Sequence, residues 1–445
     1  MYLYKIKTIL IMTKVKQANI ITMGCSKNLV DSEKLAWQLT QQGWNVEHEA
    51  EHLNHDIVFI NTCGFINDAK DESVQMILDL AEAKNLGQIK TVVVFGCLVQ
   101  RYPADLKEEV PEVDYWMGNY STAQMMKLLR LESTDSYERI NSAQGHYAYL
   151  KIAEGCDRKC SFCAIPLIKG KFISRSVDEI VAEAKYLASE GVKELLLIAQ
   201  DLSFYGHDFQ DNELLPTLVQ QLSEIQEIEW IRLHYLYPNA FPEAILTMMA
   251  ENQKICAYLD IPLQHVNDDV LKRMRRATNK KETERILTIA REKVPGICLR
   301  TTMLVGHPGE TEEAFQELLD FVKTWKFDRL GVFTYSEEEG TFGAEFLEDT
   351  IPEDVKVDRA NQLMEIQEQI SADLNKKKIG ETLKIIVDRR EAGWYYGRSE
   401  HDSVDVDNEI LFESEKFIEP GTFCEIEITD ASAFDLEGKL LRILG

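Results

Sequence analysis

Three cysteines stand close together in the segment AEGCDRKCSFCAIP, which covers residues 153–166: Cys156, Cys160 and Cys163. A closed structural zinc site takes four protein ligands, usually cysteine or histidine side chains. Here no fourth cysteine stands beside the three thiols, and the next histidine along the chain is His207. Thiolates also bind iron–sulfur clusters. The spacing therefore predicts a metal centre with one position left open for chemistry, and a zinc site completed by a distant ligand is the alternative.

Three other cysteines each follow a short apolar run: QANIITM precedes Cys25, DIVFI precedes Cys63 and TVVVFG precedes Cys97. Segments with apolar residues at helical spacing lie between the runs, so the pattern predicts a parallel sheet with covering helices. Parallel strands end at one edge of the sheet, where open α/β sheets hold their ligands. We therefore expect these three cysteines to converge there, with simple packing of the thiols as the alternative. Packing is the expectation for the cysteines inside predicted strands: Cys256, Cys298 and Cys424.

The patterns along the chain predict an α/β protein of three domains. Residues 17–130 should form an open parallel-sheet domain, and residues 131–146 are polar and aperiodic, as in a linker. Six β/α repeats over residues 147–375 predict a partial TIM-type barrel, (β/α)6, with the cysteine loop after its first strand, at the catalytic end. Residues 376–445 carry short strand patterns, one of them at 403–407, and predict a small antiparallel β-barrel of the OB type.

The composition, with 45% hydrophobic and 28% charged residues, is that of a globular protein. The longest apolar run near the start, TILIM, is too short to span a bilayer, and no signal-peptide cleavage pattern follows it. We therefore expect a cytoplasmic protein, in which clustered cysteines stay reduced and bind metal. The formal net charge of −26 disfavours non-specific binding to nucleic acid, which depends on Lys and Arg contacts to phosphates.

The motif CDRKCSFC, placed after the first strand of a partial barrel, resembles that of the radical S-adenosylmethionine enzymes. The resemblance implies a 4Fe–4S cluster on Cys156, Cys160 and Cys163, whose open iron binds the amino and carboxylate groups of S-adenosylmethionine. An electron from the cluster would then cleave this cofactor to a 5′-deoxyadenosyl radical. Phe162 matches the aromatic residue that usually stands between the second and third cysteines, and is expected near the cofactor.

Three further segments resemble the cysteine motifs of the methylthiotransferases within this superfamily: MGCSKNLVDSE (23–33), INTCGFINDAKDES (60–73) and FGCLVQRYP (95–103). The resemblance extends from about residue 17 to the end of the chain. It implies a methylthiotransferase N-terminal domain, a radical S-adenosylmethionine core domain and a C-terminal TRAM domain. It also implies a second 4Fe–4S cluster, held by Cys25, Cys63 and Cys97.

The same resemblance suggests contacts to S-adenosylmethionine. The segment TMLVGHPGET (302–311) resembles the one that borders the adenosine, which points to Gly306, although His307 departs from the usual VGFPGE form. Gln200 and Asp201 end the second barrel strand, where the superfamily places groups that bind the methionine amine.

Three further residues in or near barrel strands have expected roles that rest on less specific patterns. Arg300 could pair with the cofactor carboxylate, because a guanidinium suits bidentate recognition, and an ion pair within the barrel is the alternative. His234 and His265 are expected to be packed histidines rather than metal ligands.

The family has two branches that differ in substrate. GCSKNLVDSE, NTCGFI and YSEEEGT resemble the branch that places a methylthio group on the β-carbon of an aspartate in the twelfth protein of the small ribosomal subunit. That carbon carries no acidic proton, so a hydrogen atom has to be removed homolytically by the cofactor radical. The alternatives are a methylthiotransferase acting on adenosines of transfer RNA and a zinc-stabilised RNA-binding protein without catalysis.

The resemblance also implies how the reaction is supplied. One S-adenosylmethionine would methylate a sulfur held at the N-terminal cluster, and another would supply the radical. A reductant such as flavodoxin or ferredoxin and a sulfur donor are the further partners expected.

The C-terminal domain is acidic. Residues 376–445 contain six Lys and four Arg against six Asp and ten Glu, a balance of −6. Such a barrel suits a basic protein better than phosphates, so we expect no strong nucleic-acid binding. Asp402, Asp405 and Asp407 are expected to help attract the protein substrate. The aromatic residues of WYYGR (394–398) are expected to pack in the barrel core, with stacking on bases as the alternative.

Overall fold

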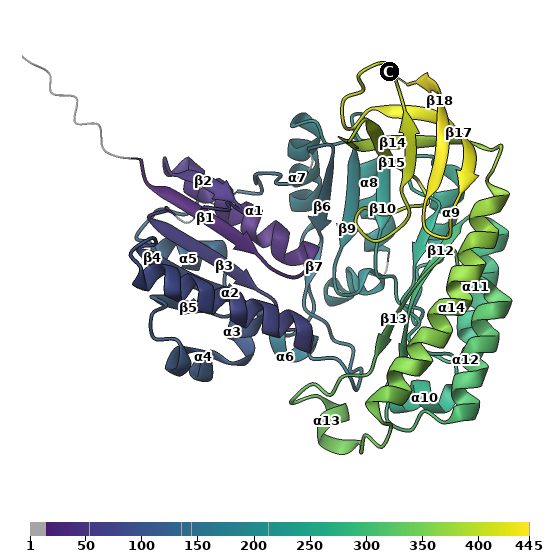
Figure 1. The fold of residues 1–445 in the computed structure, drawn as a ribbon, viewed down its shortest axis with the longest axis horizontal. Helices are drawn as coiled ribbons and strands as arrows, with labels where there is room; N and C mark the ends of the chain where they lie inside the picture. The colour runs from purple at the N-terminus through teal and green to yellow at the C-terminus, as the bar shows by residue number, and fades with distance from the viewer. Residues whose placement is uncertain (1–14, 53, 135, 144, 212, 445) are drawn as a thin grey trace, which may run out of the picture. The chain divides into compact units, whose positions relative to one another are not determined.

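The structure is a computed structural model that describes residues 15–52, 54–134, 136–143, 145–211 and 213–444 (Figure 1). The apolar run TILIM lies outside the described residues. The chain forms two compact units: one extends to Gly64 and resumes over 68–140, and the other comprises 65–67 and everything from Asn141 onward. Among the described residues, no helix combines the length and the apolarity that a bilayer crossing requires.

The first unit is built on a five-stranded parallel sheet in the order β2-β1-β3-β4-β5. Its strands are β1 (Gln17–Thr22), β2 (Asn45–His48), β3 (Ile57–Thr62), β4 (Thr91–Gly96) and β5 (Tyr115–Met117). Its helices are α1 (Ser26–Gln41), α2 (Asn67–Asn85), α3 (Cys97–Arg101), α4 (Pro103–Glu109) and α5 (Thr122–Leu128). Every residue of β3 is buried, as expected of a strand covered on both faces.

Two separate cores cover the two faces of this sheet. On one face, side chains of α1 and α5 such as Leu35 and Met125 pack against the sheet. On the other face, α2 contributes Ile77 and Leu80. The described part of the predicted linker, 131–146, forms no helix or strand, and its first half packs on this unit.

The second unit begins with a partial parallel barrel. Its six strands are β6 (Tyr147–Lys151), β9 (Glu194–Ile198), β10 (Trp230–Leu233), β11 (Tyr258–Asp260), β12 (Cys298–Val305) and β13 (Arg329–Thr334). They form two three-stranded sheets, β6-β9-β10 and β11-β12-β13, and a parallel bridge between Ile231 and Ile255 joins the two. The predicted open (β/α)6 barrel is confirmed.

Helices and short elements surround these strands. The longer helices are α7 (Val177–Ser189), α8 (Leu214–Ser223), α9 (Ala244–Glu251), α10 (Asp268–Arg273), α11 (Lys280–Lys293), α12 (Glu312–Trp325) and α14 (Glu353–Lys377). The short elements are β7 (Ala153–Glu154), α6 (Ile165–Lys169), β8 (Ile173–Ser174), η1 (Leu202–Phe204), η2 (His207–Phe209) and α13 (Phe342–Phe346). Local signals start some of these helices: α7 opens on a capping box in which the Glu179 amide donates to Ser176 Oγ over 3.3 Å.

The C-terminal part of this unit is a closed five-stranded barrel in the order β14-β15-β16-β18-β17. Its strands are β14 (Thr382–Glu391), β15 (Trp394–Ser399), β16 (Ile410–Glu413), β17 (Phe423–Ala431) and β18 (Leu436–Ile443). All neighbouring pairs are antiparallel except β16 and β18. The small barrel is confirmed, but the strand expected at 403–407 was wrong, because that stretch is a loop and the strand follows at Ile410. Of the three aromatic residues expected in the barrel core, Tyr395 lies fully buried against Phe412. Trp394 and Tyr396 are half-buried and lie outside that core cluster.

Polar contacts at Asp402 and Asp407, near the two ends of this loop, join the two barrels of the second unit. Asp402 is buried and paired with Arg329 of β13. Asp407 accepts a hydrogen bond of 2.7 Å from the Tyr258 hydroxyl. Although burial opposes ionisation, Arg329 holds the pKa of Asp402 below its usual value.

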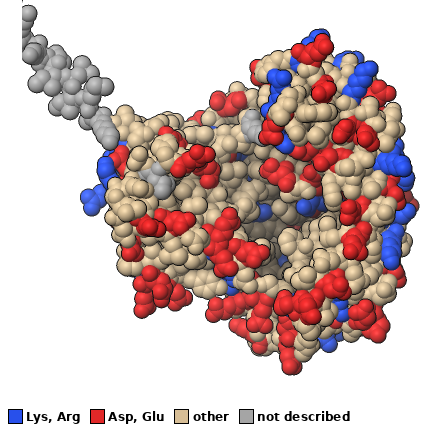
Figure 2. Space-filling model, viewed as in Figure 1, with Lys and Arg blue, Asp and Glu red and all other residues tan. Residues whose placement is uncertain are grey.

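The expectation that Asp402 and Asp407 attract a partner was therefore wrong, because both carboxylates are already paired with groups of the first barrel. Of the three aspartates, Asp405 is exposed. Figure 2 shows acidic and basic side chains side by side on the C-terminal barrel.

Candidate active site

The first cysteine group lies at the carboxyl edge of the parallel sheet. Cys25 is the N-cap of α1, just after β1. Cys63 follows β3 directly, and Cys97 follows β4 as the first residue of α3. Because β1, β3 and β4 are neighbours in the sheet, and adjacent strands lie about 4.8 Å apart, the three residues gather at one edge.

Two glycines allow the turns that carry these cysteines to approach closely. Gly24 has φ +91°, and a Cβ there would lie 2.7 Å from Cys63 Cβ and 2.9 Å from its Sγ. A Cβ at Gly64 would lie 2.7 Å from the backbone nitrogen of Leu98, next to Cys97. Any larger residue at either glycine would separate the cysteine-bearing turns.

The donors at this edge fit an iron–sulfur cluster. Cys63 and Cys97 are buried, whereas Cys25 is exposed. The Cys97 thiol lies 3.9 Å from Oδ1 of buried Asn28, whose side-chain amide donates to the Met23 carbonyl over 2.9 Å. Three thiols at one edge of a sheet are the donor set that such clusters use.

The second cysteine group occupies one loop of the barrel, between β7 and α6. The loop is held by backbone hydrogen bonds, among them Cys156 N to Gly170 O (3.1 Å) and Ser161 N to Met274 O (2.9 Å). Gly155 has φ +85°, and a Cβ there would lie 2.0 Å from the Lys171 carbonyl oxygen. Glycine is therefore required at the start of this loop.

The thiols of this loop are close enough to influence one another. Burial raises the pKa of Cys156 to about 11. Burial also raises the pKa of Cys163, and the neighbouring thiols of Cys160 and Cys156 raise it further. Thiols whose pKa is raised in this way form thiolates readily only when a cation binds them. Their chemistry thus fits a metal cluster with three protein ligands.

Two guanidinium groups lie beside this loop. Arg276 Nη1 is 3.8 Å from Cys160 Sγ. Arg158 donates from Nε to the Asp201 carboxylate over 2.8 Å. Both guanidinium carbons lie 4.1 Å from the ring centroid of Tyr237, whose hydroxyl is 3.9 Å from Cys160 Sγ. Positive charge so near the thiols stabilises anionic sulfur.

Comparison with known proteins identifies the family. Residues 17–118 match the family described as uncharacterized protein family UPF0004, residues 150–322 the radical SAM superfamily and residues 379–441 the TRAM domain. The ribosomal protein uS12 methylthiotransferase RimO of Bacteroides thetaiotaomicron is 50% identical over 432 residues, which cover 96% of this chain and 99% of the relative. The protein of the same name from Flavobacterium johnsoniae is 49% identical and covers 96% and 98%. The chain belongs to the RimO methylthiotransferase family.

Solved structures share the fold of this RimO-family chain at low sequence identity. The radical S-adenosylmethionine methyltransferase TsrM from Kitasatospora setae superposes with a TM-score of 0.56 at 14% identity, covering 86% of this chain and 80% of that one. As a RimO methylthiotransferase the chain is a radical S-adenosylmethionine enzyme, with S-adenosylmethionine and 4Fe–4S clusters as its cofactors.

Gln200 and Asp201 lie at the carboxyl end of β9, close to the cysteine loop. Gln200 Nε2 donates to Glu154 over 2.6 Å, and the Asp201 carboxylate accepts from Arg158. Gln200 Oε1 and Asp201 Oδ1 are buried with no hydrogen-bond partner among the described residues. Buried acceptors of this kind normally have a partner, so a donor such as an ammonium group suits this corner of the RimO-family barrel.

Gly306 and His307 follow β12 at the same end of the barrel. Gly306 has φ +76°, and its amide donates to Glu310 over 2.7 Å. His307 is fully buried, with Nε2 2.8 Å from the hydroxyl of Ser161. Burial lowers the pKa of His307 to about 4, so the ring is neutral. His307, where the sequence departs from the usual VGFPGE form, thus forms a hydrogen bond with the cysteine loop. Phe162 of that loop packs edge-on to the His307 ring, with 6.4 Å between the ring centroids.

Arg300 stands near the other end of β12, third of its eight residues. Its Nη1 pairs with Asp260 at 2.9 Å and its Nε with Asp407 at 3.4 Å. These pairs engage the guanidinium, and a contact between Arg300 and S-adenosylmethionine stays a prediction. His234 hydrogen bonds to Ser403 in the same region, and His265 is buried; both are packed as expected.

Sequence reasoning missed the residues that surround Cys160. Arg158 lies inside the cysteine motif, and its charge was a usable signal. Tyr237 and Arg276 lie 77 and 116 residues away along the chain and carry no local pattern that marks them.

Proposed function

We propose that this chain attaches a methylthio group to the β-carbon of an aspartate in ribosomal protein uS12. The observation that supports this most directly is the sequence identity of 50% and 49% to two uS12 methylthiotransferases, each over 96% of this chain. The presence of two cysteine triads, each at the carboxyl end of parallel strands, agrees with a reaction that needs both a radical and a bound sulfur.

Cys25, Cys63 and Cys97 are proposed to hold one 4Fe–4S cluster. The loop cysteines are proposed to hold the other: Cys156, Cys160 and Cys163. A cluster held by this loop would supply the electron that cleaves S-adenosylmethionine to a 5′-deoxyadenosyl radical. The protein contributes the positive charge of Arg158 and Arg276.

The methionine end of S-adenosylmethionine is proposed to bind beside this loop. The orphaned oxygens of Gln200 and Asp201 would accept hydrogen bonds from its ammonium group, which supplies three donors. Gly306 and Phe162 are proposed to border the remainder of the cofactor. The glycine admits the chain close to the ligand because no side chain intervenes.

An acidic segment supports a basic protein as the substrate. Residues 337–354 contain eight Asp and Glu and no Lys or Arg. Several of these side chains are exposed, among them Glu345 in α13 and Glu348 just after it. The exposed carboxylates of Glu345 and Glu348, rather than those of Asp402 and Asp407, offer negative charge at the surface to a ribosomal protein, which is typically basic.

The remaining partners and boundaries are also proposals. A flavodoxin or ferredoxin would supply electrons, and a separate donor would supply sulfur. Because thiolate ligands must stay reduced and the substrate is ribosomal, we propose that the protein is located in the cytoplasm. Domain boundaries at 17–130, 147–375 and 376–445 enclose the three matched ranges, with 131–146 as the linker.

The proposal is tested by incubating the reduced, cluster-loaded enzyme with S-adenosylmethionine, sulfide and uS12. Tandem mass spectrometry should find one methylthio group on a single aspartate. Bulk transfer RNA in a parallel reaction should yield no methylthioadenosine after digestion to nucleosides. Modification of transfer RNA without modification of uS12 would assign the chain to the other branch, and a colourless, zinc-containing protein would end the radical interpretation.

A further inference from the structure

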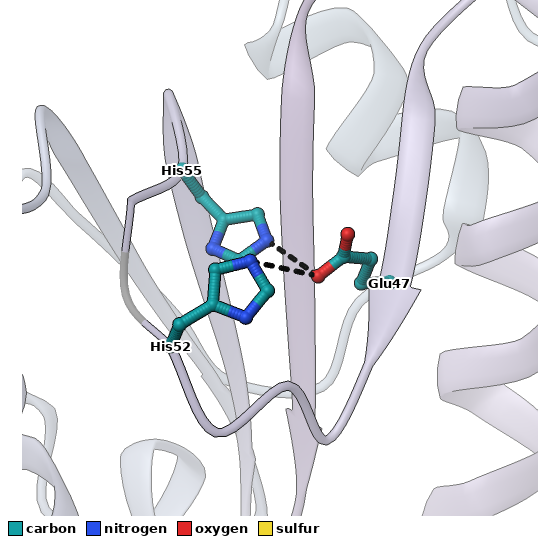
Figure 3. Close-up of side chains that lie close together, drawn as sticks. All are labelled: Glu47, His52 and His55. Carbon is teal, nitrogen blue, oxygen red and sulfur yellow. Dashed lines mark hydrogen bonds and ion pairs between the residues drawn. The ribbon is translucent and has the colours of Figure 1, made fainter.

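A group of potential metal ligands that includes no cysteine lies in the segment NVEHEAEHLNHD (45–56), which begins with β2 and leads into β3. Figure 3 shows the side chains of Glu47, His52 and His55 directed toward one another. One ligand atom from each of the three lies within 4.8 Å of the other two. No step of the proposed methylthiotransferase reaction uses these residues.

Two of the three separations between the ligand atoms are close to those in a tetrahedral metal site. Glu47 Oε2 lies 3.0 Å from His55 Nε2 and 3.5 Å from His52 Nε2. Ligands about 2.0–2.1 Å from a tetrahedral Zn²⁺ ion are separated from one another by about 3.3–3.4 Å. The observed separations lie on either side of this value. The contact of His52 is also longer than an ordinary N–H···O hydrogen bond, so hydrogen bonding alone does not account for its approach.

Burial differs among the three residues in a way that suits metal entry. The His55 side chain is 2% exposed, so its ring is held by packing, whereas the His52 side chain is 63% exposed and faces solvent. Glu47 lies between these extremes, at 37%. A fixed ligand and a solvent-exposed ligand together allow an ion to enter from solvent and to keep water at a fourth position.

Charge and chemistry favour a divalent cation. The segment 45–56 contains Glu47, Glu49, Glu51 and Asp56 and no Lys or Arg, so its own charge is negative, although Lys90 pairs with Asp56. Two imidazoles and one carboxylate are a ligand set that zinc proteins use. We propose that Glu47, His52 and His55 form a Zn²⁺ site on the first unit.

The position of the site indicates what the ion does. β2 is an edge strand of the sheet, paired with β1 alone, and none of its residues is fully buried. Bound Zn²⁺ ties this strand to the segment that enters β3 and closes the loop between them. The expected consequence is a more stable first unit, because an ion that binds only the folded state stabilises it by mass action.

The test uses the full-length enzyme with both clusters loaded, so that the cysteine thiols are occupied. Calorimetric titration with Zn²⁺ under anaerobic conditions should find one site in the unmodified protein. His52→Ala and Glu47→Gln should each weaken it at least tenfold. His48→Gln is the matched control, because His48 is on the same strand but its Nε2 lies 3.0 Å from Thr22 Oγ1, outside the triad. Equal binding by all four proteins, or equal loss in the control, would overturn the proposal.

Zinc K-edge absorption on the same sample provides a second readout. The spectrum should show nitrogen and oxygen ligands at about 2.0–2.1 Å and no sulfur at about 2.3 Å. A sulfur shell would place the ion on cysteines and reject the site. Because His52 is exposed, His52→Ala should melt at the temperature of the unmodified protein when zinc is absent and should lose only the zinc-dependent increase.

Discussion

The guanidinium of Arg276 lies 3.8 Å from the sulfur of Cys160, although the two residues are 116 positions apart in the chain. Reduction of a thiolate-bound cluster adds negative charge, so a fixed positive charge at this distance stabilises the reduced form. We therefore expect Arg276 to raise the reduction potential of a cluster held by this loop, and the first prediction addresses it.

Replacing Arg276 with Gln should lower the midpoint potential of the barrel cluster by on the order of 100 mV, the effect expected of one charge nearby in a protein interior. The measurement is a redox titration followed by electron paramagnetic resonance. It is best done in a background that carries Ala at Cys25, Cys63 and Cys97, so that one cluster gives the signal. Arg285→Gln, which removes an exposed charge paired with Glu282, should leave the potential unchanged. An unaltered potential in Arg276→Gln would show that the charge is screened.

Replacing Cys25, Cys63 and Cys97 with Ala should halve the iron content and abolish methylthio transfer, because the sulfur to be transferred has no site. Cleavage of S-adenosylmethionine to 5′-deoxyadenosine should persist. The matched control replaces the other triad with Ala: Cys156, Cys160 and Cys163. It should also lose half of the iron, and it should make no 5′-deoxyadenosine. Chromatography of the reaction products distinguishes the two variants, and identical product profiles would contradict separate roles for the triads.

Replacing Arg300 with Gln should destabilise the second unit by about 2–4 kcal/mol, since buried Asp260 keeps its contacts with His234 and the Tyr235 amide but loses its guanidinium partner. Burial alone would raise the pKa of Asp260, but Arg300 and His234 hold it at about 2, below the ordinary 3.8. The stability that Asp260 contributes is therefore fully present above pH 3.8 and is lost only as the pH falls toward 2. The decrease in melting temperature should accordingly be the same at pH 6 and pH 8.

The same variant decides between the two interpretations of Arg300. If the ion pairs are its role, the Kd for S-adenosylmethionine should change less than twofold, and Arg442→Gln, which breaks an exposed pair with Glu425, should have little effect on melting. A tenfold weaker Kd with unchanged melting would instead support the carboxylate contact.

Replacing His307 with Phe should cost about 1–3 kcal/mol, because it leaves the buried hydroxyl of Ser161 without its partner. Ser161→Ala alone should also destabilise, since the His307 nitrogen then loses its donor. The double variant should be more stable than the sum of the single effects predicts, because neither unpaired group remains. Thermal unfolding of the four proteins measures this coupling, and simple additivity would show that the hydrogen bond contributes nothing.

Reversing the charge of Glu345 and Glu348 to Lys should slow capture of uS12 several-fold at low salt, with a smaller effect at high salt. Cleavage of S-adenosylmethionine without the protein substrate should be unaffected. Reversal of Glu415 and Glu419 on the C-terminal barrel removes the same charge from another exposed surface and is the matched control. Stopped-flow binding kinetics measure the on-rate, and equal slowing in both variants would indicate net charge rather than the acidic segment as the cause.

Much of the architecture follows from the sequence, because its signals are local. Short apolar runs, separated by segments whose apolar residues recur at helical spacing, predicted the parallel sheet. That topology places Cys25, Cys63 and Cys97 after adjacent strands. The three loop cysteines likewise lie within eight consecutive residues, so the sequence alone places them on one loop. Period, capping and turn chemistry act within a few residues and can be read without knowing what packs against them.

The tertiary structure alone decided which charges meet. The sequence around Asp402 and Asp407 is polar, like that of a solvated loop. Both carboxylates are nevertheless buried, because Arg329 and Tyr258 on strands of the first barrel pair with them. The approach of Arg276 to Cys160 likewise depends on closure of the barrel. Burial and pairing are properties of two surfaces in contact, and a sequence pattern describes only one of them.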